Sequence, residues 1–380
     1  MSLRHYLLIA LVSAAVTLVL TPLVRVVALR LGLVDRPGGR KVHVEPIPRL
    51  GGLAMFLGVG TALAMQVIGE KYLGWGGAFV DAGQIKVRVV GVLLGLLVIF
   101  AVGFVDDLLT LSPGYKLAGQ IVAASIVVAA GLRIEFVGDP IHGGLIMLGL
   151  LSIPVTLVYI VGFTNVINLI DGLDGLAAGV SAIAAASLLV LALQGNRLDA
   201  AALALALIGA CLGFLRYNFH PASIFMGDSG ALFLGFALAV ISLMGVMKST
   251  ATIALAVPLL IIGVPIFDTG SAIIRRLLHS RPIQEADKGH IHHRLLGRGF
   301  DQRQTVMIIY VWCAALAVGG YAVRWSPGPI RAVAFIALFA ITGFMAYWLG
   351  LFESVQQGDA GAESVEGSSR PVSEPTSKRT

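Results

Sequence analysis

The sequence predicts an all-α, polytopic integral membrane protein, and three observations support this fold class. Hydrophobic residues make up 57% of the chain, charged residues only 13%, and the mean hydropathy is +0.90. Soluble domains carry about 25% charged residues, so a water-soluble fold is excluded. The apolar residues also gather in repeated runs of roughly 17 to 24, the length that crosses a hydrocarbon core as a helix. Such runs favour a helical bundle over a β-barrel.

We expect about eleven transmembrane helices from these runs. In chain order they lie near 6–24, 50–69, 87–104, 116–132, 144–163, 175–194, 200–215, 230–247, 253–270, 305–322 and 329–352. The first run resembles a signal peptide, but its length and the later spans favour a retained helix. The two cysteines, Cys211 and Cys313, lie inside apolar runs, so neither a disulfide framework nor a cysteine metal site is expected.

Charge along the chain predicts the orientation in the membrane. The polar segments on one side hold eighteen of the 27 Lys and Arg, and they comprise 25–49, 105–116, 164–174, 216–229, 271–304 and the tail. The positive-inside rule places this side in the cytoplasm, with the N-terminus outside and the C-terminus inside. We expect one membrane domain over 1–352 and a disordered cytoplasmic tail over 353–380. The net charge of +6 has no soluble basic domain to carry nucleic acid, so none is expected as a partner.

One polar stretch, TNVINLIDGLDGLAAG at 164–179, interrupts the apolar sequence. Asn165, Asn168, Asp171 and Asp174 recur every third residue, so a tight helical or 3₁₀-like turn would project them along one side. The glycines that follow the two aspartates argue against a rigid helix and favour backbone that bends toward a ligand. The alternative is a polar loop between helices.

Two further acidic motifs lie on the same predicted side. Asp106 and Asp107 end an apolar span, where a carboxylate at the helix centre would cost roughly 2.5 to 3.5 kcal/mol. We therefore expect them at the cytoplasmic boundary or in a wet cavity, with Lys116 as the nearby cation. Asp228 stands between two glycines before an apolar helix, and a carboxylate there with the Asn168 amide suits Mg²⁺. Interfacial or helix N-terminal capping is the alternative for these acids.

Basic residues gather in two cytoplasmic loops. The first loop, DRPGGRKVHVEPIPRLGG, contains Arg36, Arg40, Lys41, His43 and Arg49, which suit either lipid headgroups or an anionic substrate. The last long loop contains His290-Ile291-His292-His293-Arg294, whose imidazoles and guanidinium suit a diphosphate. Zinc is disfavoured, because the spacing is poor and no cysteine is near. The preceding Asp268 has no assigned role.

These motifs together resemble the polyprenyl-phosphate N-acetylhexosamine-1-phosphate transferase family, also called glycosyltransferase family 4. The resemblance runs over roughly residues 20 to 325 and rests on the motifs FVDD at 104–107, Lys116, NVINLIDGLDGL at 165–176, YNFHPASIFMGDSG at 217–230 and HIHHR at 290–294. The family implies Mg²⁺-dependent transfer of a sugar 1-phosphate from a UDP-sugar to undecaprenyl phosphate, with release of UMP. It also implies a multi-pass protein of the bacterial inner membrane with its active site facing the cytoplasm.

The resemblance implies roles for individual residues. Asp106 and Asp107 match the acidic pair beside the lipid phosphate, Asn168 and Asp228 match the metal ligands, and Asp228 is also expected to be catalytic. Mg²⁺ is the expected metal, with Mn²⁺ as its substitute. The expected substrate-binding residues are Lys116, Asn165, Asp171, Asp174 (at a uridine-contacting position), Asn218, His290, His292, His293 and Arg294.

The motifs also bear on the substrate. Enzymes that make the peptidoglycan precursor usually have three consecutive histidines and then an acid, whereas this chain has His-Ile-His-His-Arg. With the DRPGGRKVHVEPIPRLGG loop, this resembles the branch that uses UDP-N-acetylglucosamine for teichoic acid, O-antigen lipopolysaccharide or related cell-envelope glycans. We expect that donor, with phospho-N-acetylmuramoyl-pentapeptide as the alternative. Membrane lipids are expected partners, and a homodimer stays open.

Other reaction schemes and functions stay open at this point. The lipid phosphate is expected to attack the β-phosphorus directly, with Asp106 accepting or orienting its proton; a phospho-aspartate route is the alternative. From another class, a secondary transporter also carries intramembrane acids, but places them near the midplane rather than at one face. A phosphatidyl transferase using CDP-activated alcohols needs an alanine-arginine pair that DGLDGLAAG lacks.

Overall fold

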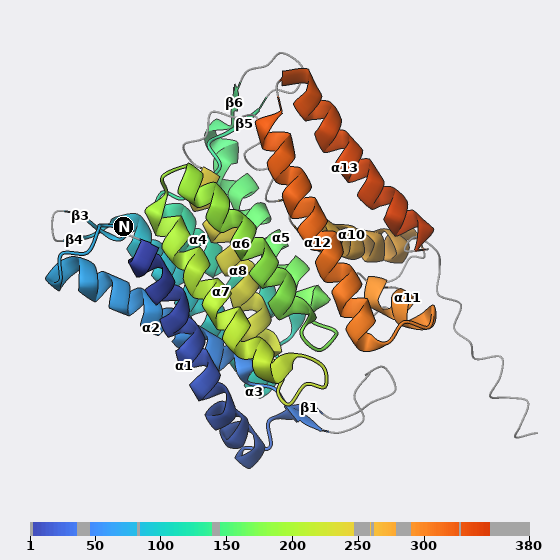
Figure 1. Cartoon of the computed structure of the whole chain (residues 1–380), viewed down its shortest axis with the longest axis horizontal. Helices are drawn as coiled ribbons and strands as arrows, with labels where there is room; N and C mark the ends of the chain where they lie inside the picture. Colours follow the sequence, from blue (N-terminus) through green and yellow to red (C-terminus); the bar gives the residue numbers. More distant parts are fainter. Residues whose placement is uncertain are drawn as a thin grey trace, which may run out of the picture.

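Long apolar helices make up most of the molecule, shown in Figure 1 as a computed structural model that describes residues 3–35, 46–81, 84–138, 145–246, 259, 262–278, 290–326 and 328–349. The helices are α1 Leu3–Arg30, α2 Gly51–Tyr72, α3 Val87–Leu109, α4 Pro113–Ala129, α5 Ser152–Ile170, α6 Leu176–Gln194, α7 Leu198–Asn218, α8 Gly227–Val246, α10 Gly263–Leu278, α11 Ile291–Gly297, α12 Gln302–Trp325 and α13 Gly328–Trp348. A 3₁₀ turn, Gly149–Leu151, precedes α5. The strands are β1 Val34–Asp35, β2 Ile47–Pro48, β3 Val80–Asp81, β4 Gln84–Ile85, β5 Phe136–Gly138 and β6 Leu145–Met147, which pair as three antiparallel hairpins.

Membrane-spanning helices are confirmed as the dominant element. Within the described residues, eight are long and apolar enough to cross a bilayer, namely α1, α2, α3, α5, α6, α7, α8 and α12, while α4 and α13 contain shorter apolar stretches. Part of the expected span at 253–270 corresponds to α10, and the rest lies outside the described residues. The expected count of about eleven, and the sides on which the termini lie, stay predictions. The tail at 353–380 and the basic residues Arg36, Arg40, Lys41 and His43 also lie outside the described part.

The centre of the bundle is formed by α6, α7 and α8, and α8 is buried along nearly its whole length. Small residues let these helices approach closely, as the fully buried Ala192, Ala204 and Ala237 show. In lipid, close packing and interhelical hydrogen bonds replace the hydrophobic effect as the force that joins helices. Ser13 of α1 supplies one such bond, donating to the Ala206 carbonyl of α7 over 2.6 Å. This bond joins α1 to the centre of the bundle.

Two helix boundaries around the polar stretch differ from expectation. The span expected at 144–163 begins instead with β6 and a 3₁₀ turn, and α5 starts at Ser152 and continues to Ile170. Asn165 and Asn168 therefore lie on a helix rather than in a loop. The bend comes later, at 171–175, where Gly175 has a φ of +79° as α6 begins. Only the two aspartates of the stretch lie in the turn.

One end of the bundle collects the polar motifs. The C-terminal ends of α3, α5 and α7 and the N-terminal ends of α4, α6 and α8 all lie at the end that carries β1 in Figure 1. At the side of the bundle, α12 packs on α6, and α10 and α13 pack on α12. The short helix α11 lies beside α12 near the same end. Residues nearly 200 positions apart in sequence are thus brought together.

Candidate active site

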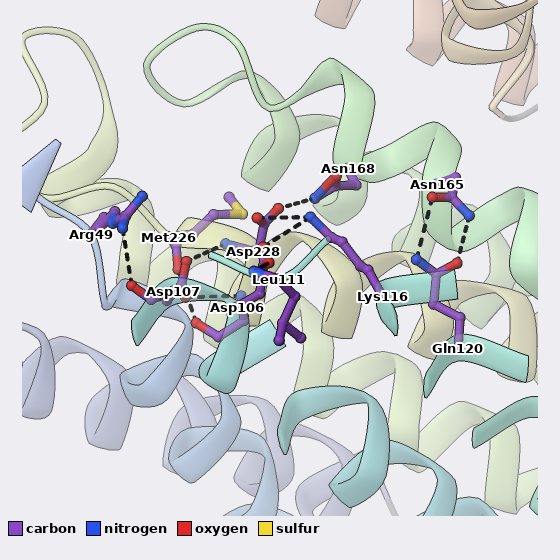
Figure 2. A network of polar contacts seen from close by, with 11 residues as sticks. Arg49, Asp106, Asp107, Leu111, Lys116, Gln120, Asn165, Asn168, Met226 and Asp228 are labelled. Atoms are coloured by element: carbon purple, nitrogen blue, oxygen red, sulfur yellow. Dashed lines mark hydrogen bonds and ion pairs between the residues drawn. The ribbon is translucent and has the colours of Figure 1, made fainter. Parts of the chain in front are cut away.

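A lysine bridges two carboxylates at this end of the bundle. Lys116, in the first turn of α4, places its Nζ 3.1 Å from Asp106 Oδ2 and 2.8 Å from Asp228 Oδ2 (Figure 2). Its position confirms the expectation of a cation beside the acidic pair. The side chains of Lys116 and Asp228 are 20% and 32% exposed, whereas that of Asp106 is only 7% exposed. A ligand arriving from outside therefore meets Asp228 and Lys116 first.

Asp107 faces a different helix from its neighbour Asp106. Its two carboxylate oxygens accept hydrogen bonds from the backbone amides of Asp228, over 2.8 Å, and Ser229, over 3.0 Å. These are amides of the first turn of α8, which have no partner within that helix. Asp228 is therefore not the N-cap of α8, the alternative weighed from its sequence position; Asp107 caps the helix from α3. Gly227 has a φ of +70°, and a Cβ there would lie 2.6 Å from the Asp107 oxygens, so the contact depends on glycine.

Asn168 and Asp228 lie side by side, as the sequence predicts. Asn168 Nδ2 in the last turn of α5 donates to Asp228 Oδ1 over 2.5 Å (Figure 2). Asp106 is held by the amide of Leu111 over 2.7 Å, in addition to Lys116. The carboxylate of Asp228 is thus fixed on both oxygens, one by an amide and the other by an ammonium group.

Asn165 points away from this cluster. Its Nδ2 donates to Gln120 Oε1 over 2.6 Å, and Gln120 Nε2 donates back to Asn165 Oδ1 over 3.3 Å. Figure 2 shows this amide pair to one side of the carboxylates, between α4 and α5. The geometry differs from the expected alignment of four polar side chains, because the pair joins two helices. Substrate contact by Asn165 stays a prediction.

Asp174 and Asn218 hold the loop between α7 and α8. Asp174 Oδ2 accepts from His220 Nδ1 over 2.7 Å and from the Ala222 amide over 3.0 Å. Asn218 is 3% exposed, accepts from the Gly175 amide over 3.1 Å and donates to the Ile224 carbonyl over 3.0 Å. Both side chains therefore brace the loop that leads into Asp228.

Asp171 lies half-buried at the end of α5. Burial, followed by the negative charges of Asp228, Asp107 and Asp174, raises the pKa of its carboxyl group to about 8. The raised pKa favours the protonated form of Asp171 over the charged form. Burial is the main cause of this shift, and the three neighbouring carboxylates that add to it are negative charges that attract cations.

The histidine segment forms the start of α11, with His290 at its N-cap position. The rings of His290 and His292 are parallel with centroids 5.8 Å apart, and those of His292 and His293 are 4.3 Å apart. Burial, helped by His293, lowers the pKa of His292 to about 3, so this imidazole is neutral at physiological pH. The His292 ring lies against Gly172 of the α5–α6 turn, where an added Cβ would lie 3.0 Å from Nε2. The segment thus borders the turn that carries Asp171.

The comparisons with known proteins agree with this site. The model of the family described as "Glycosyl transferase family 4" matches residues 89–246, the part that contains Asp106, Lys116, Asn168 and Asp228. A probable undecaprenyl-phosphate N-acetylglucosaminyl 1-phosphate transferase of Bacillus subtilis is 42% identical over 300 residues, which cover 79% of this chain and 80% of that protein. The chain belongs to glycosyl transferase family 4.

Two other relatives of this family 4 protein cover even more of the chain. A decaprenyl-phosphate N-acetylglucosaminephosphotransferase of Mycolicibacterium smegmatis is 37% identical over 385 residues, covering 95% of this chain and 91% of the relative. An undecaprenyl-phosphate alpha-N-acetylglucosaminyl 1-phosphate transferase of Yersinia pestis is 28% identical, covering 84% of this chain and 86% of the relative. The likeness therefore extends through nearly the full length of these proteins.

The family 4 site offers oxygen ligands for a divalent cation. Across the described residues, no group of three or more His, Cys, Asp or Glu is close enough to hold a metal alone. Mg²⁺ does not need such a group, because it is usually held by one or two carboxylates and keeps waters or substrate phosphates. The Asp228 carboxylate fits this requirement, and the Asn168 amide, which presents Nδ2 to Asp228, would have to turn over to offer its oxygen to the same cation. The excess of carboxylates around Lys116 also favours a cation.

Several contacts of this family 4 site were not predicted from the sequence. Arg49 was recognised only as part of a basic loop, but its Nη2 donates to the Asp107 carbonyl over 3.1 Å. Gln120 of α4 pairs with Asn165 of α5, His220 of the loop after α7 pairs with Asp174, and Asp268, which had no role assigned from the sequence, pairs with His290. No motif or spacing signals such pairs, since the partners lie far apart in sequence.

Backbone contacts also connect the first loop to the start of α8. Phe225 N donates to the Pro48 carbonyl over 2.8 Å, and Gly51 N donates to the Phe225 carbonyl over 2.9 Å. Gly52 N continues this pairing to the Met226 carbonyl over 2.8 Å. The segment that follows the basic loop is therefore part of the site's framework.

Proposed function

We propose that this protein transfers N-acetylglucosamine 1-phosphate from UDP-N-acetylglucosamine to undecaprenyl phosphate and releases UMP. The observation that carries the proposal is the Lys116 bridge between Asp106 and Asp228, beside Asn168, at the end of the bundle where the polar motifs gather. A diphosphate donor and a phosphate acceptor repel each other, so their reaction needs fixed positive charge and a cation. The names of the relatives from Bacillus subtilis and Yersinia pestis support the donor and the acceptor.

The reaction we propose is a single displacement. An oxygen of the lipid phosphate attacks the β-phosphorus of the nucleotide sugar, the bond from that phosphorus to the bridging oxygen breaks, and UMP leaves with that oxygen. Bound Mg²⁺, with Mn²⁺ as its substitute, would withdraw charge from the phosphate oxygens, held by Asp228 and Asn168. Lys116 lies where it can bind the phosphates next to this cation. Asp106, already bonded to Lys116 and to the Leu111 amide, orients the lysine more than it accepts a proton.

The remaining residues position the donor. We propose that His292 and His293 bind the diphosphate as hydrogen-bonding imidazoles, with Arg294 supplying permanent positive charge. The α5–α6 turn, with Asp171 and Asp174, would lie near the uridine. In this arrangement the reaction takes place at the cytoplasmic face of a bacterial inner membrane, where nucleotide sugars are present.

Release of UMP tests the proposed function. Purified protein in lipid, given Mg²⁺, undecaprenyl phosphate and UDP-N-acetylglucosamine, should release UMP and form a lipid-linked sugar. The same mixture with EDTA, or without the lipid, should release none. Turnover only with UDP-N-acetylmuramoyl-pentapeptide, or none with any UDP-sugar, would contradict the proposal. Tags in the 216–229 and 271–304 loops that report from opposite sides of the membrane would contradict the proposed orientation.

Gly172→Ala should weaken donor binding. The added methyl group would lie 2.9 to 3.0 Å from the His292 ring, closer than carbon and nitrogen atoms normally approach, so this ring must shift. A shift of about 1 Å in a positioning group can cost about 10²-fold in rate. We expect kcat/KM for the UDP-sugar to fall toward that extent while KM for the lipid phosphate is unchanged.

Gly162→Ala is the matched control for this change, because a Cβ at position 162 of α5 meets open space. Equal activities of the two variants would show that the contact between His292 and the turn has no functional role.

A further inference from the structure

A buried aspartate lies behind the histidine segment. Asp268 of α10 is 1% exposed, and its Oδ1 accepts from the Ile291 amide over 2.7 Å. Its Oδ2 lies 3.0 Å from His290 Nδ1. One carboxylate thus both caps the first turn of α11 and pairs with the imidazole before it. None of the substrate-binding or metal roles proposed above involves this residue.

The pairing decides which nitrogen of His290 carries a proton. A carboxylate accepts hydrogen bonds and donates none, so His290 must present Nδ1–H to Asp268. Its Nε2 is then the nitrogen whose proton and hydrogen bonding remain free to change. A fixed tautomer of this kind is set by the bond at the other ring nitrogen. The hydrogen bond also fixes the plane of the His290 ring. The His292 ring packs parallel to it, so the plane of His290 restricts the orientation of His292.

We propose that Asp268 is a positioning residue, which holds His290 in the Nδ1–H form and thereby places His292 and His293 for the diphosphate of the donor. The link runs from Asp268 to His290 through the hydrogen bond, from His290 to His292 through the parallel rings, and from His292 to the α5–α6 turn at Gly172. This inference rests on the proposed function for its effect on the donor. The tautomer itself does not depend on that function.

If the Asp268 carboxylate is replaced by an amide, the two N–H groups that now donate to it compete for a single acceptor oxygen. Asn has one acceptor oxygen, whereas Ile291 N–H and His290 Nδ1–H both need one. The Ile291 amide cannot change, so the oxygen stays with it and the NH₂ group turns toward His290. His290 must then accept at Nδ1 and move its proton to Nε2. Asp268→Asn is therefore expected to exchange the tautomer with little change of volume, and Asp268→Glu should retain the Nδ1–H form.

Magic-angle-spinning NMR of the full-length protein in lipid bilayers, labelled with ¹³C,¹⁵N-histidine, reads the tautomer directly. The signal of His290 is identified among the eight histidines by its loss in His290→Gln. We expect a protonated Nδ1 in the unmodified protein and in Asp268→Glu, and a protonated Nε2 in Asp268→Asn. UMP release should show a loss of about 10- to 100-fold in kcat/KM for UDP-N-acetylglucosamine in Asp268→Asn, with KM for the lipid phosphate unchanged. Asp268→Glu should recover part of that loss.

Asp301→Asn is the matched control, since Asp301 caps α12 by accepting from the Gln304 amide but pairs with no histidine in the described structure. It should leave the His290 signal and the activity unchanged. An unchanged tautomer in Asp268→Asn, or a changed tautomer with normal donor kinetics, overturns the proposal. If the unmodified protein transfers no sugar phosphate, the proposed function fails, and the NMR signal still decides whether Asp268 holds the Nδ1–H form.

Discussion

Asp228→Asn is expected to lower turnover by about 10²- to 10³-fold or more, the loss seen when one group that stabilises developing charge is removed. The carboxylate is the most exposed acid of the bridge and lies next to both Lys116 and Asn168. An amide keeps the shape but loses the charge, so both the proposed cation and the ammonium group lose their main partner. UMP release at saturating donor and lipid, measured over a range of Mg²⁺ concentrations, would show the loss.

The fold should survive this change. The α8 helix is capped by Asp107 through the backbone amides of Asp228 and Ser229, which the substitution does not alter. Asp199→Asn serves as the matched control, because Asp199 also lies in the first turn of a helix, α7, and pairs with Arg197 at the other end of the bundle. Normal activity of Asp228→Asn at ordinary Mg²⁺ would contradict the metal assignment. A lower melting temperature than that of Asp199→Asn would show that the carboxylate acts mainly on the fold.

Lys116→Met should have an effect of similar size. Methionine keeps much of the chain length but removes the charge that lies 3.1 Å from Asp106 and 2.8 Å from Asp228. The two carboxylates then face each other without their shared cation. The incoming phosphates also lose the ammonium group that we expect to contact them. We expect kcat to fall by about 10²-fold or more, with the loss persisting at saturating Mg²⁺.

Lys86→Met is the control for Lys116. Lys86 precedes α3 at the other end of the bundle and donates to the Ala78 carbonyl over 2.9 Å, so it also makes one defined polar contact. This variant should keep full UMP release. If both lysine variants behave alike, Lys116 is not part of the reaction site.

The sequence predicted the fold class because apolar runs long enough to span a membrane leave few alternatives. It also predicted that Asp106, Lys116, Asn168 and Asp228 converge, since polar groups at helix ends on one membrane face have to share a small area. The extent of α5 was harder to predict. Asn165 and Asn168 were expected in a tight turn after a span that ends near residue 163. Gln120 and Asp228 on other helices satisfy their amides, so the helix continues past both. Such partners cannot be seen from spacing along one segment.

The sequence also did not predict that Asp106 and Asp107 have different hydrogen-bond partners. Adjacent residues on a helix point about 100° apart, so the two carboxylates reach different neighbours. Asp106 turns to Lys116 on α4, whereas Asp107 turns to the amides of α8. The expected span at 144–163 failed for a related reason: Leu145, Ile146 and Met147 are apolar but pair with β5 as a hairpin. Local hydrophobicity does not distinguish a strand from the start of a helix over so few residues.

The pairing of residues 48–52 with 225–226 has a consequence for biosynthesis. A ribosome delivers the second helix of the chain long before it delivers the eighth, so the backbone groups of Gly51 and Gly52 must wait for Phe225 and Met226 to emerge. The candidate active site is therefore completed late in membrane insertion, after most helices are in place. A nascent chain stopped ahead of residue 225 would contain the lysine and the first two acids, yet it would lack the surface that aligns them.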